Sequence, residues 1–257
     1  MKRNLTAGFL ILVLLLGGCA AASPEPTQWP QDKPLTVHFI DEEVGNSALL
    51  ECGGDYMLIC GGADGLRAAS CLEALGVEEL AAVVLTGEGA GVLENYPASA
   101  VYAPAKTGPS LQDVEITVPE PGHQFWLGGT KVTFLGPIQP APEADGTAIV
   151  LRAEYGENSF LFAGDMGEAA LNDLLDYWNG DLQADVLNLS GNTTDSRLLE
   201  AAAPDCVILS GTSATEEAGV TVYRTDELGT IAAKADGEEI LFSWSLQSSS
   251  SAVSTAG

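Results

Sequence analysis

The chain has 257 residues, and its 10 lysines and arginines against 36 aspartates and glutamates give a formal net charge of −26 at pH 7. Non-specific binding to nucleic acid depends on clustered basic side chains that displace counterions from phosphates, so this charge balance argues against a general nucleic-acid binder. Hydrophobic residues make up 46% of the chain, which is enough to bury a core and excludes a disordered acidic tail.

The first residues have the pattern of a signal peptide. Lys2 and Arg3 precede an apolar run from Phe9 to Leu16, and this run is shorter than the roughly 20 residues that a membrane-spanning helix needs. The next residues, Gly17-Gly18-Cys19, complete a sequence that resembles the lipobox of bacterial lipoproteins. That resemblance implies removal of residues 1–18 and lipidation of Cys19, which would anchor the chain to the lipid bilayer at the extracytoplasmic face of a bacterial cell membrane.

The anchor would be followed by a tether. Residues 19–34 contain prolines at positions 24, 26, 30 and 34 and show no apolar period, so we expect a linker. Residues 247–257 are small and polar, and we expect a disordered tail. The folded domain is therefore predicted to span residues 35–246.

Strand and helix patterns follow one another through this domain. Runs of β-branched and alternating apolar residues predict strands, and longer stretches with helical spacing predict helices. The predicted strands are 35–40, 48–52, 56–60, 81–85, 114–118, 131–135, 148–155, 160–163, 184–189, 207–209, 220–223, 230–235 and 240–244, and the predicted helices are 66–75, 168–178 and 196–203. This order predicts two sheets that are covered by helices.

The stretch Leu35–Gly62, LTVHFIDEEVGNSALLECGGDYMLICGG, resembles the opening of metallo-β-lactamase-fold hydrolases related to the domain of the ComEC DNA-uptake channel. Members of that group typically read VHFIDVGQGDS and, later, LIDGG. Further similar stretches follow in the same order: AAVVLTG near Thr86, FLFAGD ending at Asp165, ADVLNLS from Ala184 and VYRTDELGTI from Val222. The resemblance implies an α+β fold, a single αββα sandwich with a metal site at one edge between the sheets.

The metal-binding motifs of that group are degenerate in this chain. The group needs T-H-x-H-x-D-H after its fourth strand, since imidazoles and a carboxylate hold the metal ions that activate water. Here that motif and the later G-H-H-G-S motif lack every histidine. Asp165 aligns with the metal-bridging carboxylate and is retained, whereas Cys60 replaces the aspartate of LIDGG. The degenerate ligand positions are Gly87, Gly89, Gly91, Val92, Gly191 and Asn192.

A count of histidines leads to the same expectation. The chain contains only His38, in the middle of a predicted strand, and His123, in a predicted turn, and we interpret both as ordinary structural residues. We therefore expect no metal cofactor, with Asp165 as the weak residual candidate and a cap of the following helix as its alternative role. An oxygen-rich site for Ca²⁺ or Mg²⁺ stays open as an alternative; it would use Asp41, Glu42, Glu43, Glu88 and Asp165.

Four cysteines remain beside Cys19: Cys52, Cys60, Cys71 and Cys206. An exported chain permits disulfides, and Cys60 with Cys71 is the local candidate pair. No cysteine has a histidine near it in the sequence, and no G-x-S-x-G elbow is present, so the sequence gives no support to cysteine or serine catalysis.

Two functions remain. The sequence favours a lipid-anchored protein that has lost the catalytic metal site and binds an unidentified protein or small-molecule partner. The alternative is an extracytoplasmic metal-dependent hydrolase, of a phosphodiesterase or nuclease kind, with a remodelled carboxylate site. A role in processing DNA is opposed by the acidic charge of the chain.

Overall fold

Two β-sheets lie face to face in the structure, which is a computed structural model and describes residues 33–42, 45–62, 65–86, 89–103, 114–138, 149–164, 166–190, 195–210 and 219–244. The predicted signal peptide and tail lie outside these residues, as does the linker except for its last two positions. In the described ranges, no helix is both long and apolar enough to cross a membrane.

The first sheet is mixed. From β15 to β3 neighbouring strands are antiparallel, and from β3 to β6 they are parallel. Its described strands lie in the order β15 (Ile240–Trp244), β14 (Ile231–Ala235), β1 (Leu35–Ile40), β2 (Ser47–Cys52), β3 (Asp55–Cys60), β4 (Ala82–Leu85), β5 (Val101–Tyr102) and β6 (Ile116–Thr117).

The second sheet is also mixed. Its parallel strands β10 to β13 end at one edge of the sandwich, while β7 to β10 are antiparallel to their neighbours. Its described strands lie in the order β13 (Thr221–Arg224), β12 (Cys206–Ser210), β11 (Val186–Ser190), β10 (Asn158–Gly164), β9 (Val150–Tyr155), β8 (Thr130–Gly136) and β7 (Gln124–Leu127).

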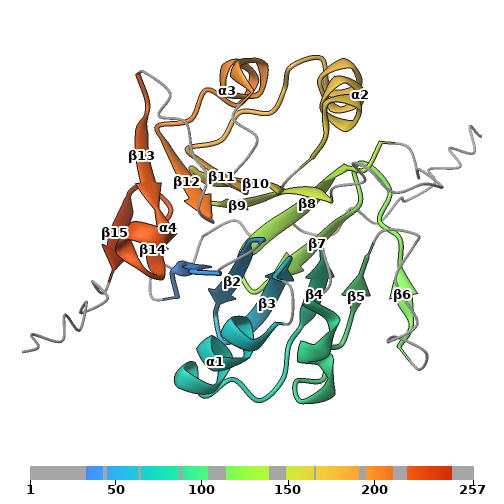
Figure 1. Cartoon of the computed structure of the whole chain (residues 1–257), viewed down its shortest axis with the longest axis vertical. Helices are drawn as coiled ribbons and strands as arrows, with labels where there is room; N and C mark the ends of the chain where they lie inside the picture. Colours follow the sequence, from blue (N-terminus) through green and yellow to red (C-terminus); the bar gives the residue numbers. More distant parts are fainter. Residues whose placement is uncertain are drawn as a thin grey trace, which may run out of the picture.

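Helices cover the outer faces of both sheets (Figure 1). Helix α1 (Leu66–Leu75) and the 3₁₀ helix η1 (Gly89–Glu94) lie on the first sheet, and α2 (Glu168–Trp178) and α3 (Ser196–Ala202) lie on the second. The short helix α4 (Thr225–Leu228) connects β13 to β14. The predicted αββα sandwich is therefore confirmed.

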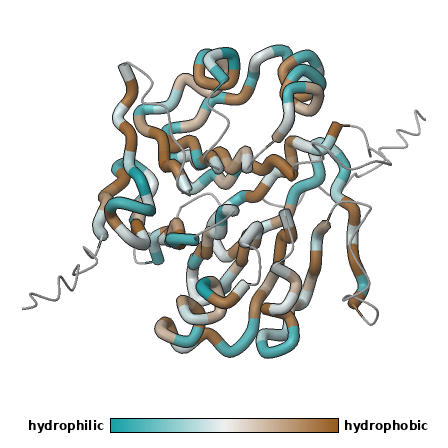
Figure 2. Tube along the Cα trace, in the orientation of Figure 1, coloured by the Kyte–Doolittle hydropathy of each residue, from teal (hydrophilic) through white to brown (hydrophobic). Residues whose placement is uncertain are grey.

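Alternating side chains of the strands explain this layering. Phe39 of β1 and Phe162 of β10 point between the sheets, and their ring centroids lie 6.1 Å apart. Residues one position away, such as Leu161, face the helices instead. Figure 2 shows hydrophobic residues concentrated along the central strands and hydrophilic residues on much of the outer helices. Burial of the inner faces supplies the main driving force for this fold.

Candidate functional site

The strands β3, β4, β10, β11 and β12 end at one edge of the sandwich, and polar side chains gather there. Asn46 directly precedes β2, Ser47 begins it, Thr86 follows β4, Asn188 lies within β11, and Ser210 ends β12. Side chains alternate along β11, so Asn188 points between the sheets as Val186 does. This edge is where the resemblance places a metal site.

Three of these side chains form a buried hydrogen-bond network. Asn46 Nδ2 donates to Asn188 Oδ1 at 3.2 Å, and Asn188 Nδ2 donates to Ile208 O at 3.2 Å and to Ser210 Oγ at 3.3 Å. Asn188 is only 2% exposed, and Asn46 and Ser210 are also buried. The backbone carbonyl of Asn46 accepts a hydrogen bond from Gly61 N at 2.8 Å. We call Asn46, Asn188 and Ser210 the amide network; it joins the two sheets at this edge.

Cys60 lies beside this network and contacts one of the degenerate ligand positions. Its thiol donates to Gly89 O at 3.5 Å, and Ser47 Oγ donates to Cys60 Sγ at 3.9 Å. A Cβ atom added at Gly89 would overlap Cys60 Sγ. Any side chain at Gly89, including a histidine, therefore needs a displacement of Cys60 or of η1.

The neighbouring ligand positions have become structural or exposed. Val92, which stands where the resemblance requires a histidine, is buried against α1 residues such as Leu72. Gly91, in place of the aspartate, is exposed on η1. The other predicted site residues, Cys19, Gly87, Asp165, Gly191 and Asn192, lie outside the described residues.

The carboxylates of the alternative oxygen-rich site are only partly described. Arg67 Nη1 donates to Asp41 Oδ2 and Asp41 O, both at 3.0 Å, so this aspartate is held by a guanidinium. Glu42 is 4% exposed and its carboxylate lies against Gly62. Glu43, Glu88 and Asp165 lie outside the described residues. Within the described part of the chain, no group of three or more histidine, cysteine, aspartate or glutamate side chains is arranged to hold a metal ion.

The alternative role of Asp165 as a cap of the following helix stays a prediction, because Asp165 lies outside the described residues. Gly167 occupies the N-cap position of α2, with extended backbone angles and no side-chain cap hydrogen bond.

One histidine lies on the outer face of a sheet and the other in an aromatic cluster. His38 is on the outer face of the first sheet, opposite to its core neighbours Val37 and Phe39. Burial lowers the pKa of His38, and the charge of Glu51 opposes that shift. His123 packs its ring against Tyr102 and Phe134, with centroids 5.8 Å from each.

All four described cysteines have free thiols, so the candidate pair Cys60–Cys71 is not bonded. Burial, with the charges of Asp205 and Asp185, raises the pKa of Cys206 to about 12, and burial also raises the pKa of Cys71. A thiol must ionise to act as a nucleophile, so neither thiol is poised for catalysis.

The amide network was missed at the sequence level. A signal was present, because Asn188 interrupts the apolar run VLNLS of β11. A buried polar side chain in such a strand requires a partner, yet the sequence does not reveal that the partner is Asn46.

No protein-family model matches this chain, and comparison with curated proteins gives no match. Solved structures do match. The metallo hydrolase Igni18 from the archaeon Ignicoccus hospitalis superposes with a TM-score of 0.53 at 14% identity, over 77% of this chain and 98% of that one. The metallo-β-lactamase fold protein YhfI from Bacillus subtilis superposes with a TM-score of 0.50 at 15% identity, over 74% of this chain and 96% of that one.

This chain has the metallo-β-lactamase fold. That fold implies a metal site at the edge described above, but the described donors there do not fit one. Zinc is bound by imidazoles, thiolates and carboxylates, whereas the amide network offers neutral groups that are already bonded to one another. The Cys60 thiol is engaged by a backbone carbonyl.

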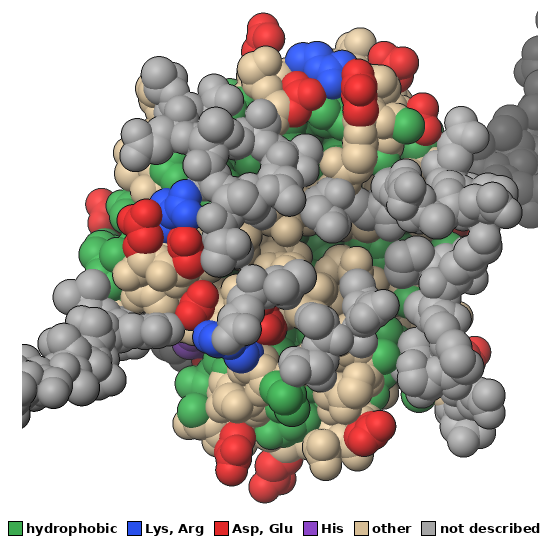
Figure 3. Space-filling view, viewed as in Figure 1, with side chains coloured by type: hydrophobic (Ala, Val, Ile, Leu, Met, Phe, Trp, Pro, Cys, Tyr) green, Lys and Arg blue, Asp and Glu red, His purple; other side chains and the backbone are tan. Residues whose placement is uncertain are grey.

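Most charges on the surface are negative. Figure 3 shows acidic side chains around the described surface of one face, with the few basic side chains lying beside acidic ones. Three such ion pairs are Arg67–Asp41 at 3.0 Å and Arg197–Asp195 and Arg224–Asp226 at 2.7 Å. Pairing of this kind leaves these arginines without an open positive field.

Proposed function

We propose that this chain is a lipoprotein, anchored through Cys19 at the extracytoplasmic face of a bacterial membrane, whose metallo-β-lactamase-fold domain acts by binding a partner and not by metal-dependent hydrolysis. The observation that carries this proposal is the amide network at the edge of the sandwich. The partner is a protein or a small molecule, and the acidic surface argues against a nucleic acid.

The chemistry of the edge supports a binding role. A hydrolytic metal lowers the pKa of a bound water to about 7, which requires a firmly held cation. The Nδ2 group of Asn188 donates to both Ile208 O and Ser210 Oγ. A metal ligand in place of Asn188 would therefore break the network. The loops in which the fold resemblance expects histidines contain none.

The network also gives the edge a fixed shape. A fully bonded polar network specifies one arrangement of the elements that it joins. Thr86 Oγ1, next to Gly61, is buried without a hydrogen-bond partner among the described residues.

Metal analysis tests the proposal. The full-length chain would be purified in detergent, dialysed, and analysed for zinc, manganese, iron, calcium and magnesium, with assays on a phosphodiester and a β-lactam. We expect no stoichiometric metal and no turnover. Asp165→Ala, with the exposed Asp173→Ala as its matched control, should leave both results unchanged. One metal ion retained per chain, or metal-dependent hydrolysis abolished by Asp165→Ala, would favour the remodelled hydrolase instead.

A further inference from the structure

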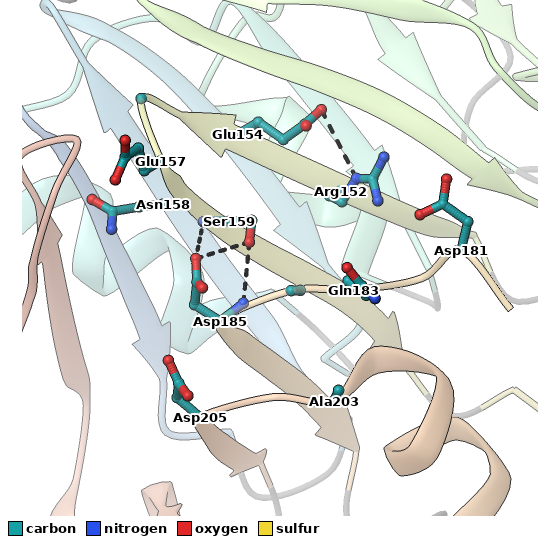
Figure 4. Close-up of a pocket in the computed structure, with 12 residues that line it drawn as sticks. Arg152, Glu154, Glu157, Asn158, Ser159, Asp181, Gln183, Asp185, Ala203 and Asp205 are labelled. Atoms are coloured by element: carbon teal, nitrogen blue, oxygen red, sulfur yellow. Dashed lines mark hydrogen bonds and ion pairs between the residues drawn. The ribbon is translucent and has the colours of Figure 1, made fainter.

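A hollow lies on the outer face of the second sheet, whereas the amide network lies between the two sheets. It is formed at the amino ends of the parallel strands β10, β11 and β12, whereas the amide network lies toward their carboxyl ends. Its volume is about 650 Å³, within the range of small-molecule sites. We call it the Arg152 pocket. Figure 4 shows side chains that line it, among them Arg152, Glu154, Glu157, Asp181, Asp185 and Asp205.

Arg152 is held only loosely by the protein. Its side chain is 19% exposed, and its Nε is buried without a hydrogen-bond partner among the described residues. Arg152 Nε forms an ion pair with Glu154 Oε2 at 3.9 Å, which is too long for a hydrogen bond (Figure 4). Lys131 Nζ lies closer to the same carboxylate oxygen, at 2.9 Å. A largely buried guanidinium of this kind is suited to a carboxylate supplied by a ligand.

The neighbouring strand β8 carries a second polar side chain without a hydrogen bond. Thr133 of β8 is paired with Arg152 of β9, so the two side chains share a face of the sheet. Thr133 is buried, and its hydroxyl makes no hydrogen bond to any residue that the structure describes. Arg152 Nε and the Thr133 hydroxyl are thus two neighbouring polar groups without a hydrogen bond among the described residues, where native proteins normally pair such groups.

Carboxylates in the rest of the pocket supply the opposite charge. Asp185 Oδ2 accepts hydrogen bonds from Ser159 N at 2.6 Å and Ser159 Oγ at 2.8 Å. Asp181, Asp205 and Glu157 form no ion pair with a basic side chain of the described residues. In Figure 4, Asp181 lies near Arg152, while Glu157 and Asp205 lie toward the other end.

We propose that the Arg152 pocket binds a basic amino acid or a short basic peptide, with a ligand carboxylate on Arg152 and ligand ammonium groups on the carboxylates. One guanidinium among several acids matches a ligand with one negative and more than one positive charge. A polyamine would offer Arg152 no carboxylate, and its positive charges would be repelled by the guanidinium. The only apolar side chains that line the pocket are Ala184 and Ala203, so the ligand is polar throughout.

Calorimetric titration of the full-length chain in detergent tests this assignment with three probes. L-lysine carries all the charges; cadaverine lacks the carboxylate; 6-aminohexanoate lacks the α-amino group. We expect L-lysine to bind at least about tenfold more tightly than either analogue, because each analogue gives up a charge-assisted contact. Cadaverine that binds as tightly as L-lysine, or L-lysine that fails to bind, would overturn the proposal. This comparison needs no variant.

Variants then assign the contacts. Arg152→Gln should weaken L-lysine binding about tenfold and leave cadaverine binding unchanged or stronger, whereas Asp205→Asn should weaken both. Arg197→Gln is the matched control, because Arg197 is exposed on α3 and paired with Asp195, and it should bind all probes as the wild type does. Arg152→Gln with unaltered L-lysine affinity would contradict the assignment. Thermal unfolding of each variant would show that it is folded before titration.

Discussion

Asn46 and Asn188 are 142 residues apart in the sequence, and their side-chain amides meet across the two sheets at 3.2 Å. The bond links the residue before β2 to the middle of β11, at the edge where the fold would otherwise carry metal ligands. Both side chains are buried, so removing the Asn188 amide takes the acceptor from Asn46 Nδ2, and removing Asn46 takes this donor from Asn188 Oδ1.

We expect Asn188→Ala to lower the free energy of unfolding by about 2–4 kcal/mol. The substitution deletes three hydrogen bonds and leaves the buried Asn46 amide without its acceptor at position 188. Urea denaturation would measure this loss. Asn172→Ala is the control, because Asn172 is an exposed asparagine that accepts a hydrogen bond from Arg197; it should change stability by less than about 0.5 kcal/mol. Equal effects of the two variants would mean that the amide network does not stabilise the edge.

His38 should make the protein less stable in mild acid. Burial lowers its folded-state pKa below the ordinary value of 6.5, so the unfolded chain takes up a proton that the folded chain resists. The stability is therefore complete above about pH 6.5 and falls as the pH drops from there toward the lowered pKa. Urea unfolding between pH 7.5 and 5 should show this decline in the wild type and a flatter profile in His38→Gln.

Glu51 gives an independent check on the same histidine. Its charge raises the pKa of His38 and so opposes the effect of burial. Removing that charge in Glu51→Gln should lower the pKa further and steepen the loss of stability in acid. The carboxylates of Asp195 and Asp236, whose pKa values are lowered from 3.8, act at more acidic pH and stay outside this window. A Glu51→Gln profile flatter than that of the wild type would contradict the burial argument.

Local patterns predicted the long elements of this fold well. Helix α1 ends where predicted because Gly76 adopts a left-handed conformation, with φ of 68°, and its N–H bonds back to Glu73 O and Leu72 O. The predicted bounds of β1, α2 and β15 also match the structure. Such elements carry their own period and end signals.

Short elements were missed because tertiary contacts define them. Strand β5 has two residues and exists through its parallel pairing with β4 and β6, and β7 (Gln124–Leu127) through its pairing with β8. The 3₁₀ helix η1 carries Gly89 and Gly91, which have weak helical propensity. The amide network has the same origin, since a contact across 142 residues leaves no local period in the sequence.

Cys19→Ser should release the protein from the membrane. The lipobox resemblance assigns the acyl anchor to Cys19, and the acidic surface would itself be repelled by anionic headgroups. Detergent-phase partitioning of cells that express each form would measure the change, with the buried Cys206→Ser as a cysteine control. The wild type and Cys206→Ser should enter the detergent phase, and Cys19→Ser the aqueous phase. Retention of Cys19→Ser in detergent would refute lipidation at this residue.

Gly89 and Cys60 should be energetically coupled. A Cβ at Gly89 would overlap Cys60 Sγ, so Gly89→Ala should destabilise the wild-type chain by about 1–3 kcal/mol through overpacking. In a Cys60→Ala background the sulfur is gone, and the same substitution should cost markedly less. A double-mutant cycle measured by urea unfolding would yield this coupling, which neighbouring residues typically show at about 0.5–3 kcal/mol.

The control for this cycle is Gly91→Ala, because Gly91 is exposed on the same 3₁₀ helix. Gly91→Ala should raise the free energy of unfolding or leave it unchanged, both in the wild type and in Cys60→Ala. The reason is that alanine restricts the unfolded chain more than glycine does. Additive effects of Gly89→Ala and Cys60→Ala would mean that the cost of Gly89→Ala does not come from the Cys60 sulfur. Strong coupling would instead show that Cys60 occupies the space that a ligand side chain at position 89 requires, so that restoring a histidine there also demands a smaller residue at position 60.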